Sequence, residues 1–291
     1  MFKTAVITDE ITQDFKLALE IANKHGLDAV EVRSVYEMGP FEWTDEIVDR
    51  IKSEADQAGL PICCISSPFF KCEIDDMEEI ANQYESLRRC IDHAHKLGTH
   101  LIRGFTFWDK GDFDVRLPDI VDRFVKPVRI LEQENMVMVL ESDPGVYTGN
   151  AAKVMKVLDA IDSPRIMGLW DPGNIVYDPD GEIPYPDGYE LIKDKMAHMH
   201  LKDAGIVDGK PAGVPIGIGA VDYEGQFRQL VKDGYAGYVS LETHYRPAHS
   251  ISKELLAMPK GSAFSHGGQE ATEESLILWK QLMDRIGISK M

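Results

Sequence analysis

Three carboxylates and one imidazole stand at the ends of four apolar runs in the second half of the chain. The runs read MVMVLE, IMGLWD, MAHMH and YVSLE, and they end at Glu141, Asp171, His200 and Glu242. Three carboxylates gathered in one place would repel one another and lose hydration unless a cation neutralised them. This donor set suits Mn²⁺, Mg²⁺ or Co²⁺, and Zn²⁺ is also compatible. The residues therefore predict one divalent metal ion, with Mn²⁺ preferred.

Each of these residues also has a purely structural interpretation. A single acid at a strand end is more often solvated or a cap, and a single strand histidine is more often a hydrogen-bonded core residue. Four such residues at the ends of consecutive runs favour a shared site. Because side chains alternate along a strand, His198, His200 and Lys202 share one face, which could point into a common interior.

The elements that would position these residues repeat along the whole chain. Eight short apolar runs alternate with amphipathic segments, at residues 3–8, 29–33, 62–66, 100–104, 136–141, 166–171, 197–201 and 238–242. The first and last runs begin at residues 3 and 238, which gives about 34 residues for each repeat, the size of one strand-plus-helix unit. The sequence therefore predicts an array of βα units.

Helical patterns lie between the runs. Apolar residues at spacings of three to four occur in segments that end at Gly26, Gly59, Gly98 and Gly234. Asn150 and Asp222 are expected to cap two further helix starts. The fourth helix is expected around residues 120–134, with Pro127 kinking it or delaying its start. In the sixth unit, the proline-rich DPDGEIPYPDGYELI predicts a long loop before a short helix.

Eight such units favour a closed parallel (β/α)8 TIM barrel, which typically needs about 250 residues. We expect one domain over residues 1–291, with a barrel core over about 3–246 and an extra C-terminal segment, 247–291. A doubly wound open sheet is the alternative, but TDEITQD follows the first run where a glycine-rich turn would be usual. The lone Gly217-Ile218-Gly219 is interpreted as a flexible loop before a helix rather than a phosphate cradle.

The C-terminal segment departs from the repeat. Residues 247–268 are candidates for a lid or for a contact between subunits of a homo-oligomer, and a last helix is expected over about 270–286. In a TIM barrel the carboxyl ends of all strands meet at one mouth, so the four ligand candidates are expected to converge there.

Five short motifs in this order resemble the sugar isomerase/epimerase superfamily, which has a xylose isomerase-like TIM barrel. The motifs are ESD, WDPGN, HMHLKD, GIGAVDYEGQF and SLETH, and the resemblance extends over about residues 3–246. It implies that Glu141, Asp171, His200 and Glu242 are the metal ligands. It also implies that the two glutamates are the catalytic acid and base.

The chemistry expected of such a site begins with a metal ion that coordinates the carbonyl oxygen and a neighbouring hydroxyl of a sugar or sugar phosphate. The metal would acidify the proton between them and stabilise a cis-enediolate. One glutamate would remove that proton. Returning a proton to the opposite face of the same carbon gives an epimer, and returning it to the neighbouring carbon gives an aldose or ketose isomer. The alternative is a metal-dependent lyase or dehydratase on a keto-polyol or keto-glycoside, which shares the proton-abstraction step.

Seven further residues are candidates for substrate binding, and most of them have a structural alternative. Lys202 is expected to polarise a substrate oxygen or to pair with Asp203. Asn174 stands where many relatives carry a histidine, and it can still hydrogen-bond a hydroxyl. For the arginines the alternative is a salt bridge to a strand-end acid, for Ser67 a turn before Pro68, and for Trp108 loop packing. The set is Lys202, Asn174, Arg33, Arg103, Ser67, Trp108 and His244.

Composition excludes several classes of function. The chain has 31 basic and 49 acidic residues, a formal charge of −18, which disfavours nucleic acids and anionic membrane surfaces as partners. A multinuclear zinc endonuclease would need more histidines and a basic face, and a metal-free sugar-binding protein would not need three convergent carboxylates. The start of the sequence lacks a secretory apolar stretch, so a cytoplasmic location is expected. The four cysteines are expected to be buried and reduced.

Overall fold

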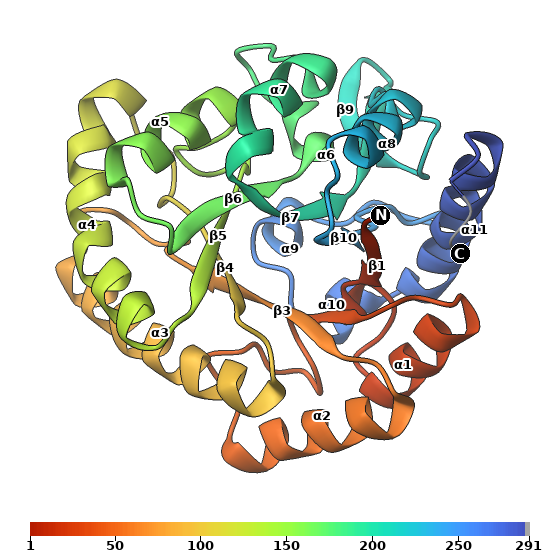
Figure 1. Cartoon of the computed structure of the whole chain (residues 1–291), viewed down its shortest axis with the longest axis horizontal. Helices are drawn as coiled ribbons and strands as arrows, with labels where there is room; N and C mark the ends of the chain where they lie inside the picture. Colours follow the sequence, from red (N-terminus) through yellow and green to blue (C-terminus); the bar gives the residue numbers. More distant parts are fainter. Residues whose placement is uncertain (289–291) are drawn as a thin grey trace.

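Eight parallel strands form a nearly closed barrel at the centre of the molecule (Figure 1). The structure, a computed structural model, describes residues 1–288. The strands are β1 Lys3–Val6, β2 Val30–Val32, β3 Ile62–Phe69, β4 Leu101–Gly104, β5 Val137–Glu141, β6 Ile166–Trp170, β7 Met196–Leu201 and β10 Tyr238–Leu241. Their order is β1-β10-β7-β6-β5-β4-β3-β2, and a bridge between Ile7 and Glu31 joins the two ends. The predicted TIM barrel is confirmed.

A ring of helices surrounds the barrel (Figure 1). The main helices are α1 Phe15–Lys24, α2 Asp45–Ala58, α3 Met77–Leu97, α4 Phe113–Gln133, α5 Ala151–Ile161, α8 Tyr223–Lys232 and α11 Gly268–Arg285. Local signals fix their ends: Asn150 and Asp222 accept hydrogen bonds from the first turns of α5 and α8, as predicted. Helix α11 forms ion pairs to α1 through Glu273 and to α8 through Arg285, so it closes the ring between them.

Helix α4 begins earlier than expected. It starts at Phe113, after the Asp112 cap, and continues through Pro118 and Pro127 to Gln133. The expectation that Pro127 delays the start was therefore wrong. The cap supplies acceptors for the first backbone N–H groups, and Phe113, Ile120 and Phe124 bury one face of the helix.

Two insertions interrupt the repeat. As expected, the sixth unit has a long loop and only short helical pieces: α6 Pro172–Ile175, η2 Pro184–Gly188, α7 Tyr189–Ile192 and η3 Lys193–Lys195. After β7, the strands β8 Asp203–Val207 and β9 Lys210–Val214 form an antiparallel hairpin that the sequence patterns did not reveal. A shorter element, η1 Thr8–Glu10, follows β1.

Residues 247–268 cross the carboxyl ends of the strands and carry α9 Lys253–Ala257 and α10 Gly261–Ser265 (Figure 1). Ser265 Oγ donates to Asp9 O at 2.7 Å, and Lys71 Nζ, just after β3, donates to Ala257 O at 2.8 Å. This segment therefore covers the mouth of the barrel. Residues 289–291 of the expected C-terminal segment lie outside the described residues.

A cluster of apolar side chains fills the interior of the barrel beneath the mouth. Leu101, Val139 and Leu169 belong to a separate buried cluster with Cys63 and Cys64. The three aliphatic residues stand two positions before Arg103, Glu141 and Asp171, so strand alternation points them into the same interior. All four cysteines are buried and free, as expected. Among the described residues, none of the helices is both long and apolar enough to cross a membrane.

Candidate metal centre

The four predicted ligand residues meet at the carboxyl end of the barrel. His200 Nδ1 lies 3.3 Å from Glu141 Oε1, 3.5 Å from Glu242 Oε2 and 3.8 Å from Asp171 Oδ2. The ligand atoms of all four residues lie within 4.8 Å of one another, and the four side chains are buried. Ligands bound at about 2.1 Å to one ion are separated by about 3 to 4.2 Å. The cluster therefore has the dimensions of a site for one divalent ion.

Asp171 is oriented by the turn that follows it. It caps α6, and its Oδ1 accepts a hydrogen bond from Asn174 N at 3.0 Å. Its other oxygen, Oδ2, is buried and accepts no well-oriented hydrogen bond among the described residues, although the Lys202 ammonium lies 2.7 Å away. A buried carboxylate oxygen without such a bond is the kind of atom that a bound cation would satisfy.

Asn174 holds the neighbouring glutamate. Its Nδ2 donates to Glu141 Oε1 at 3.2 Å and to Ser142 O at 2.9 Å. The amide at the position where many relatives carry a histidine thus orients a ligand candidate. Contact between Asn174 and a substrate stays a prediction.

Gly173 in the WDPGN motif is needed for close packing beneath the site. A Cβ atom there would lie 2.2 Å from the backbone oxygen of Lys202. We predict that Gly173→Ala lowers the free energy of unfolding by about 1–3 kcal/mol, because the end of β7 must shift. Denaturant unfolding would measure this, with Gly111→Ala, where a Cβ meets open space, as the matched control. Equal stability of the two variants would contradict the prediction.

Three buried cations lie against the carboxylates. Lys202 Nζ is 2.5 Å from Glu242 Oε2, so Lys202 pairs with the ligand cluster rather than with Asp203. Arg33 Nη1 is 2.5 Å from Glu242 Oε1, and Arg103 Nη1 is 2.9 Å from Glu141 Oε2. Both arginines thus form the salt bridges that were the structural alternative for them, and a role in substrate binding stays a prediction.

These pairings shift the acidity of the carboxyl groups. Burial raises the pKa of Glu141, but Arg103 and His200 outweigh it and lower that pKa to about 2. For Glu242, burial is likewise outweighed by His244, Lys202 and His200, and the pKa falls well below its usual range. For Asp171, burial outweighs Lys202 and the pKa is raised. Both glutamates are therefore held ionised at neutral pH.

The formal charges of the buried network leave room for a divalent cation. Six carboxylates and four permanent cations lie around the mouth, joined by ion pairs or through the histidines, and once a metal ion replaces the extra proton of His200 the formal charges leave two negative charges. The carboxylates are Asp9, Glu10, Glu31, Glu141, Asp171 and Glu242, and the cations are Arg33, Arg103, Lys202 and Arg246. Unbalanced charges in a buried site are costly, and one divalent ion would neutralise them.

The other substrate-binding candidates make internal contacts. Ser67 Oγ donates to Arg103 O at 2.6 Å, because β3 continues to Phe69 and forms no turn before Pro68. Trp108 is half-buried, with Lys71 Nζ 5.7 Å from its ring centroid. His244 Nε2 lies 3.3 Å from Glu10 Oε1 and 3.4 Å from Glu242 Oε1. Whether any of the three touches a substrate is still a prediction.

The glycine pair before α8 lies in a loop that binds Asp203. Gly217 N and Gly219 N donate to Asp203 Oδ2 at 2.9 and 3.0 Å. The expected loop before a helix is present, and its backbone amides bind a carboxylate of the same chain; its flexibility stays a prediction. This contact also explains why Asp203 does not pair with Lys202.

Sequence reasoning missed three buried acids at the site. Asp9 and Glu10 lie in η1 and bind Arg33, and Glu31 in β2 binds His198 and His200. Glu31 stands two residues before Arg33 and so shares its face, which is the signal that could have revealed it. For Asp9 and Glu10 the available signal was their position directly after the first strand.

The comparisons with known proteins agree with the barrel fold. A sequence model of the family described as xylose isomerase-like TIM barrel matches residues 19–265. Among curated proteins, 3-oxo-isoapionate decarboxylase of Pectobacterium atrosepticum is 29% identical over 130 residues, covering 42% of this chain and 44% of that protein. Inosose dehydratase of Clostridium perfringens is 27% identical over 138 residues, covering 41% and 44%. The matched region thus spans less than half the length of these relatives.

Solved structures resemble the chain over nearly its whole length. The IOLI protein with a bound zinc atom has a TM-score of 0.74 at 15% identity, covering 98% of this chain and 99% of that chain. D-allulose 3-epimerase from Methylomonas sp. in complex with D-allulose has a TM-score of 0.72 at 14% identity, covering 96% of each. At these identities the likeness establishes the fold alone.

Proposed function

The chain belongs to the xylose isomerase-like TIM barrel family, and we propose that it is a divalent-metal-dependent sugar epimerase or aldose–ketose isomerase. The observation that carries the proposal is the buried cluster of Glu141, Asp171 and Glu242 around His200 Nδ1. These four residues would hold the ion, for which we propose Mn²⁺. The bound ion would supply Lewis acidity that makes a proton beside a carbonyl group easier to remove.

The two glutamates are suited to move that proton. Each directs one oxygen toward His200 and the other toward a guanidinium: Glu141 Oε2 toward Arg103, and Glu242 Oε1 toward Arg33. Arg103 Nη1 lies between them, 2.9 Å from Glu141 Oε2 and 3.8 Å from Glu242 Oε1. The carboxylates therefore flank one region from two strands, where one can take a proton from carbon and the other can return one.

The remaining buried groups would prepare the site for this transfer. The Lys202 ammonium, between Asp171 and Glu242, is placed to stabilise negative charge that develops on a substrate oxygen. Residues 247–268 cover the mouth, and the Phe264 ring lies 4.7 Å from Arg33 Cζ. Excluding water in this way would strengthen the electrostatic contacts around the reacting carbon.

The charge pattern favours an uncharged substrate over a sugar phosphate. Five buried cations near the mouth already have carboxylate partners: Arg33, Arg103, Lys202, Arg246 and Lys71, whose Nζ is 2.7 Å from Asp143. A phosphate would have to compete with a carboxylate for any of them. We predict that kcat/KM for a free ketose exceeds that for its phosphate ester about tenfold or more, measured on matched pairs of substrates. Equal or reversed values would contradict this.

A second candidate function is a lyase reaction on a keto-polyol. It is favoured by the similarity to an inosose dehydratase and to a 3-oxo-isoapionate decarboxylase. Proton removal beside a carbonyl would begin a dehydration in the same way, and the outcome would differ only in whether the carbanionic species is reprotonated or expels a leaving group.

One experiment tests both candidates. The Mn²⁺-loaded protein is incubated in D₂O with a panel of ketoses and keto-polyols, and carbon-bound deuterium and products are followed by NMR. An epimerase or isomerase gives a deuterated isomer that keeps all heavy atoms of the substrate, and a lyase gives a product that has lost a leaving group. Absence of exchange and of products across the panel would overturn the proposal.

A further inference from the structure

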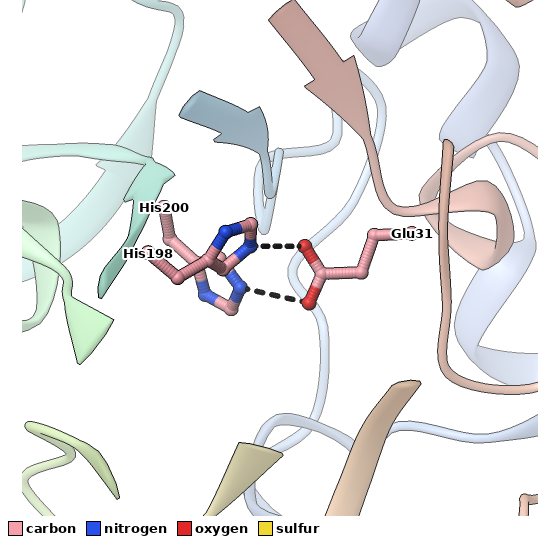
Figure 2. A group of neighbouring side chains, drawn as sticks. All are labelled: Glu31, His198 and His200. Atoms are coloured by element: carbon pink, nitrogen blue, oxygen red, sulfur yellow. Dashed lines mark hydrogen bonds and ion pairs between the residues drawn. The ribbon is translucent and has the colours of Figure 1, made fainter. Parts of the chain in front are cut away.

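A buried carboxylate from the opposite side of the barrel faces the imidazole of the candidate centre. Glu31 in β2 receives both histidines of β7: His198 Nε2 lies 2.8 Å from Glu31 Oε2, and His200 Nε2 lies 3.2 Å from Glu31 Oε1 (Figure 2). All three side chains are fully buried. Ser66 Oγ donates a further hydrogen bond to Glu31 Oε1. The carboxylate of Glu31 thus accepts hydrogen bonds from three side chains.

This trio has the spacing of hydrogen bonds rather than of ligands around a second ion. The 2.8 Å separation of His198 Nε2 and Glu31 Oε2 is typical of N–H···O⁻ contacts and shorter than the separation of about 3 Å expected between ligands on one ion. A carboxylate offers only acceptors, so each Nε2 that faces it carries a proton. In His200 this leaves Nδ1, which faces Glu141, Asp171 and Glu242, as the nitrogen whose proton a bound metal ion would replace.

We propose that Glu31 is a positioning residue that holds His200 in its Nε2–H tautomer and directs Nδ1 at the metal. This inference rests on the proposed function, since it assigns a role in that same centre. A partner on the second nitrogen of a ligating histidine fixes the tautomer and the ring orientation, and its loss typically costs about 10- to 100-fold in metal affinity.

His198 acts in this arrangement through Glu31. It binds Oε2 while His200 binds Oε1, so the carboxylate is held at both oxygens and cannot rotate away from His200. His198 Nδ1 is buried and has no hydrogen-bond partner among the described residues. It lies on the strand face shared with His200, with the two rings 5.5 Å apart and nearly perpendicular. His198 is thus an anchor for Glu31 rather than a metal ligand.

The test reads the coordinating nitrogen directly. Protein labelled with ¹⁵N-histidine is loaded with ¹¹³Cd²⁺, and the one-bond coupling between cadmium and nitrogen is recorded by NMR. We expect coupling to Nδ1 of His200, with its Nε2 protonated, and no coupling to His198. Coupling to Nε2 of His200 would overturn the inference and leave the proposed function standing, whereas a protein that bound no cadmium would overturn both.

A variant separates positioning from mere packing. Glu31→Gln has nearly the same shape, but its amide has only one acceptor oxygen for two imidazole N–H groups. We expect the Cd²⁺ and Mn²⁺ dissociation constants to rise about 10- to 100-fold, and the Nδ1 coupling to weaken or vanish. The control is Ser240→Ala, a buried hydroxyl paired in register with His200 but without a hydrogen-bond partner among the described residues. Metal affinity and Nδ1 coupling in Glu31→Gln equal to those of the wild-type protein would overturn the inference. If the variant does not fold, the cadmium coupling measured on the wild-type protein tests the inference alone.

Discussion

Glu242→Gln is expected to reduce the rate of substrate proton exchange by at least about 10³-fold while leaving the fold intact. The amide cannot accept a proton from carbon, and general acid–base catalysis by one side chain typically contributes about 10²- to 10⁴-fold. The change also removes one of the four candidate ligands and one partner each of Lys202 and Arg33. Deuterium incorporation by NMR measures the rate, and circular dichroism checks the fold.

A matched pair of variants makes this prediction specific. Glu141→Gln should cause a loss of similar size, because Glu141 faces His200 from β5 as Glu242 does from β10. Glu42→Gln, a surface glutamate paired with Lys260, serves as the control and should retain the wild-type rate. Full activity in folded Glu242→Gln would refute the acid–base assignment.

Removal of the metal is expected to abolish exchange and to lower the stability of the protein. The buried network carries two formal negative charges that an ion would neutralise, so binding should favour the folded state. At a free Mn²⁺ concentration of 100 times Kd, the gain in the free energy of unfolding is about 2.7 kcal/mol. Thermal unfolding of the chelator-treated protein, titrated with Mn²⁺, measures this gain together with the return of activity.

The matched variant for this experiment is Asp171→Asn. Its amide keeps the Oδ1 cap of α6, but an NH2 group replaces the buried Oδ2 and the ion pair with Lys202 is lost. The metal-free variant should therefore melt at a lower temperature than the metal-free wild type, and its melting temperature should respond to Mn²⁺ much less. An identical melting temperature of the wild-type protein with and without metal would contradict a metal site in this cluster.

Much of the fold was predictable because its signals are local. A run such as MVMVLE is the short continuous apolar run of a strand buried on both faces, and it ends in its own polar residue. Asn150 or Asp222 caps a helix within three residues of itself. Helix α4 was placed too late because a proline rule was weighed without the cap at Asp112. The hairpin after β7 lacks a strong alternating pattern, and its one local signal, the Asp208-Gly209 turn between Val207 and Lys210, was missed.

The barrel and the four residues that meet at its mouth could be predicted from the amino-acid sequence, because in a parallel barrel the ends of all strands lie on the same side. The residues that surround these four could not be predicted in this way. Arg33 reaches Glu242 across 209 residues of chain, and Glu31 reaches His198 across 167. Such pairings depend on which strands face each other across the closed ring and on the burial that makes an unpartnered charge costly, and neither can be read from neighbours in the chain.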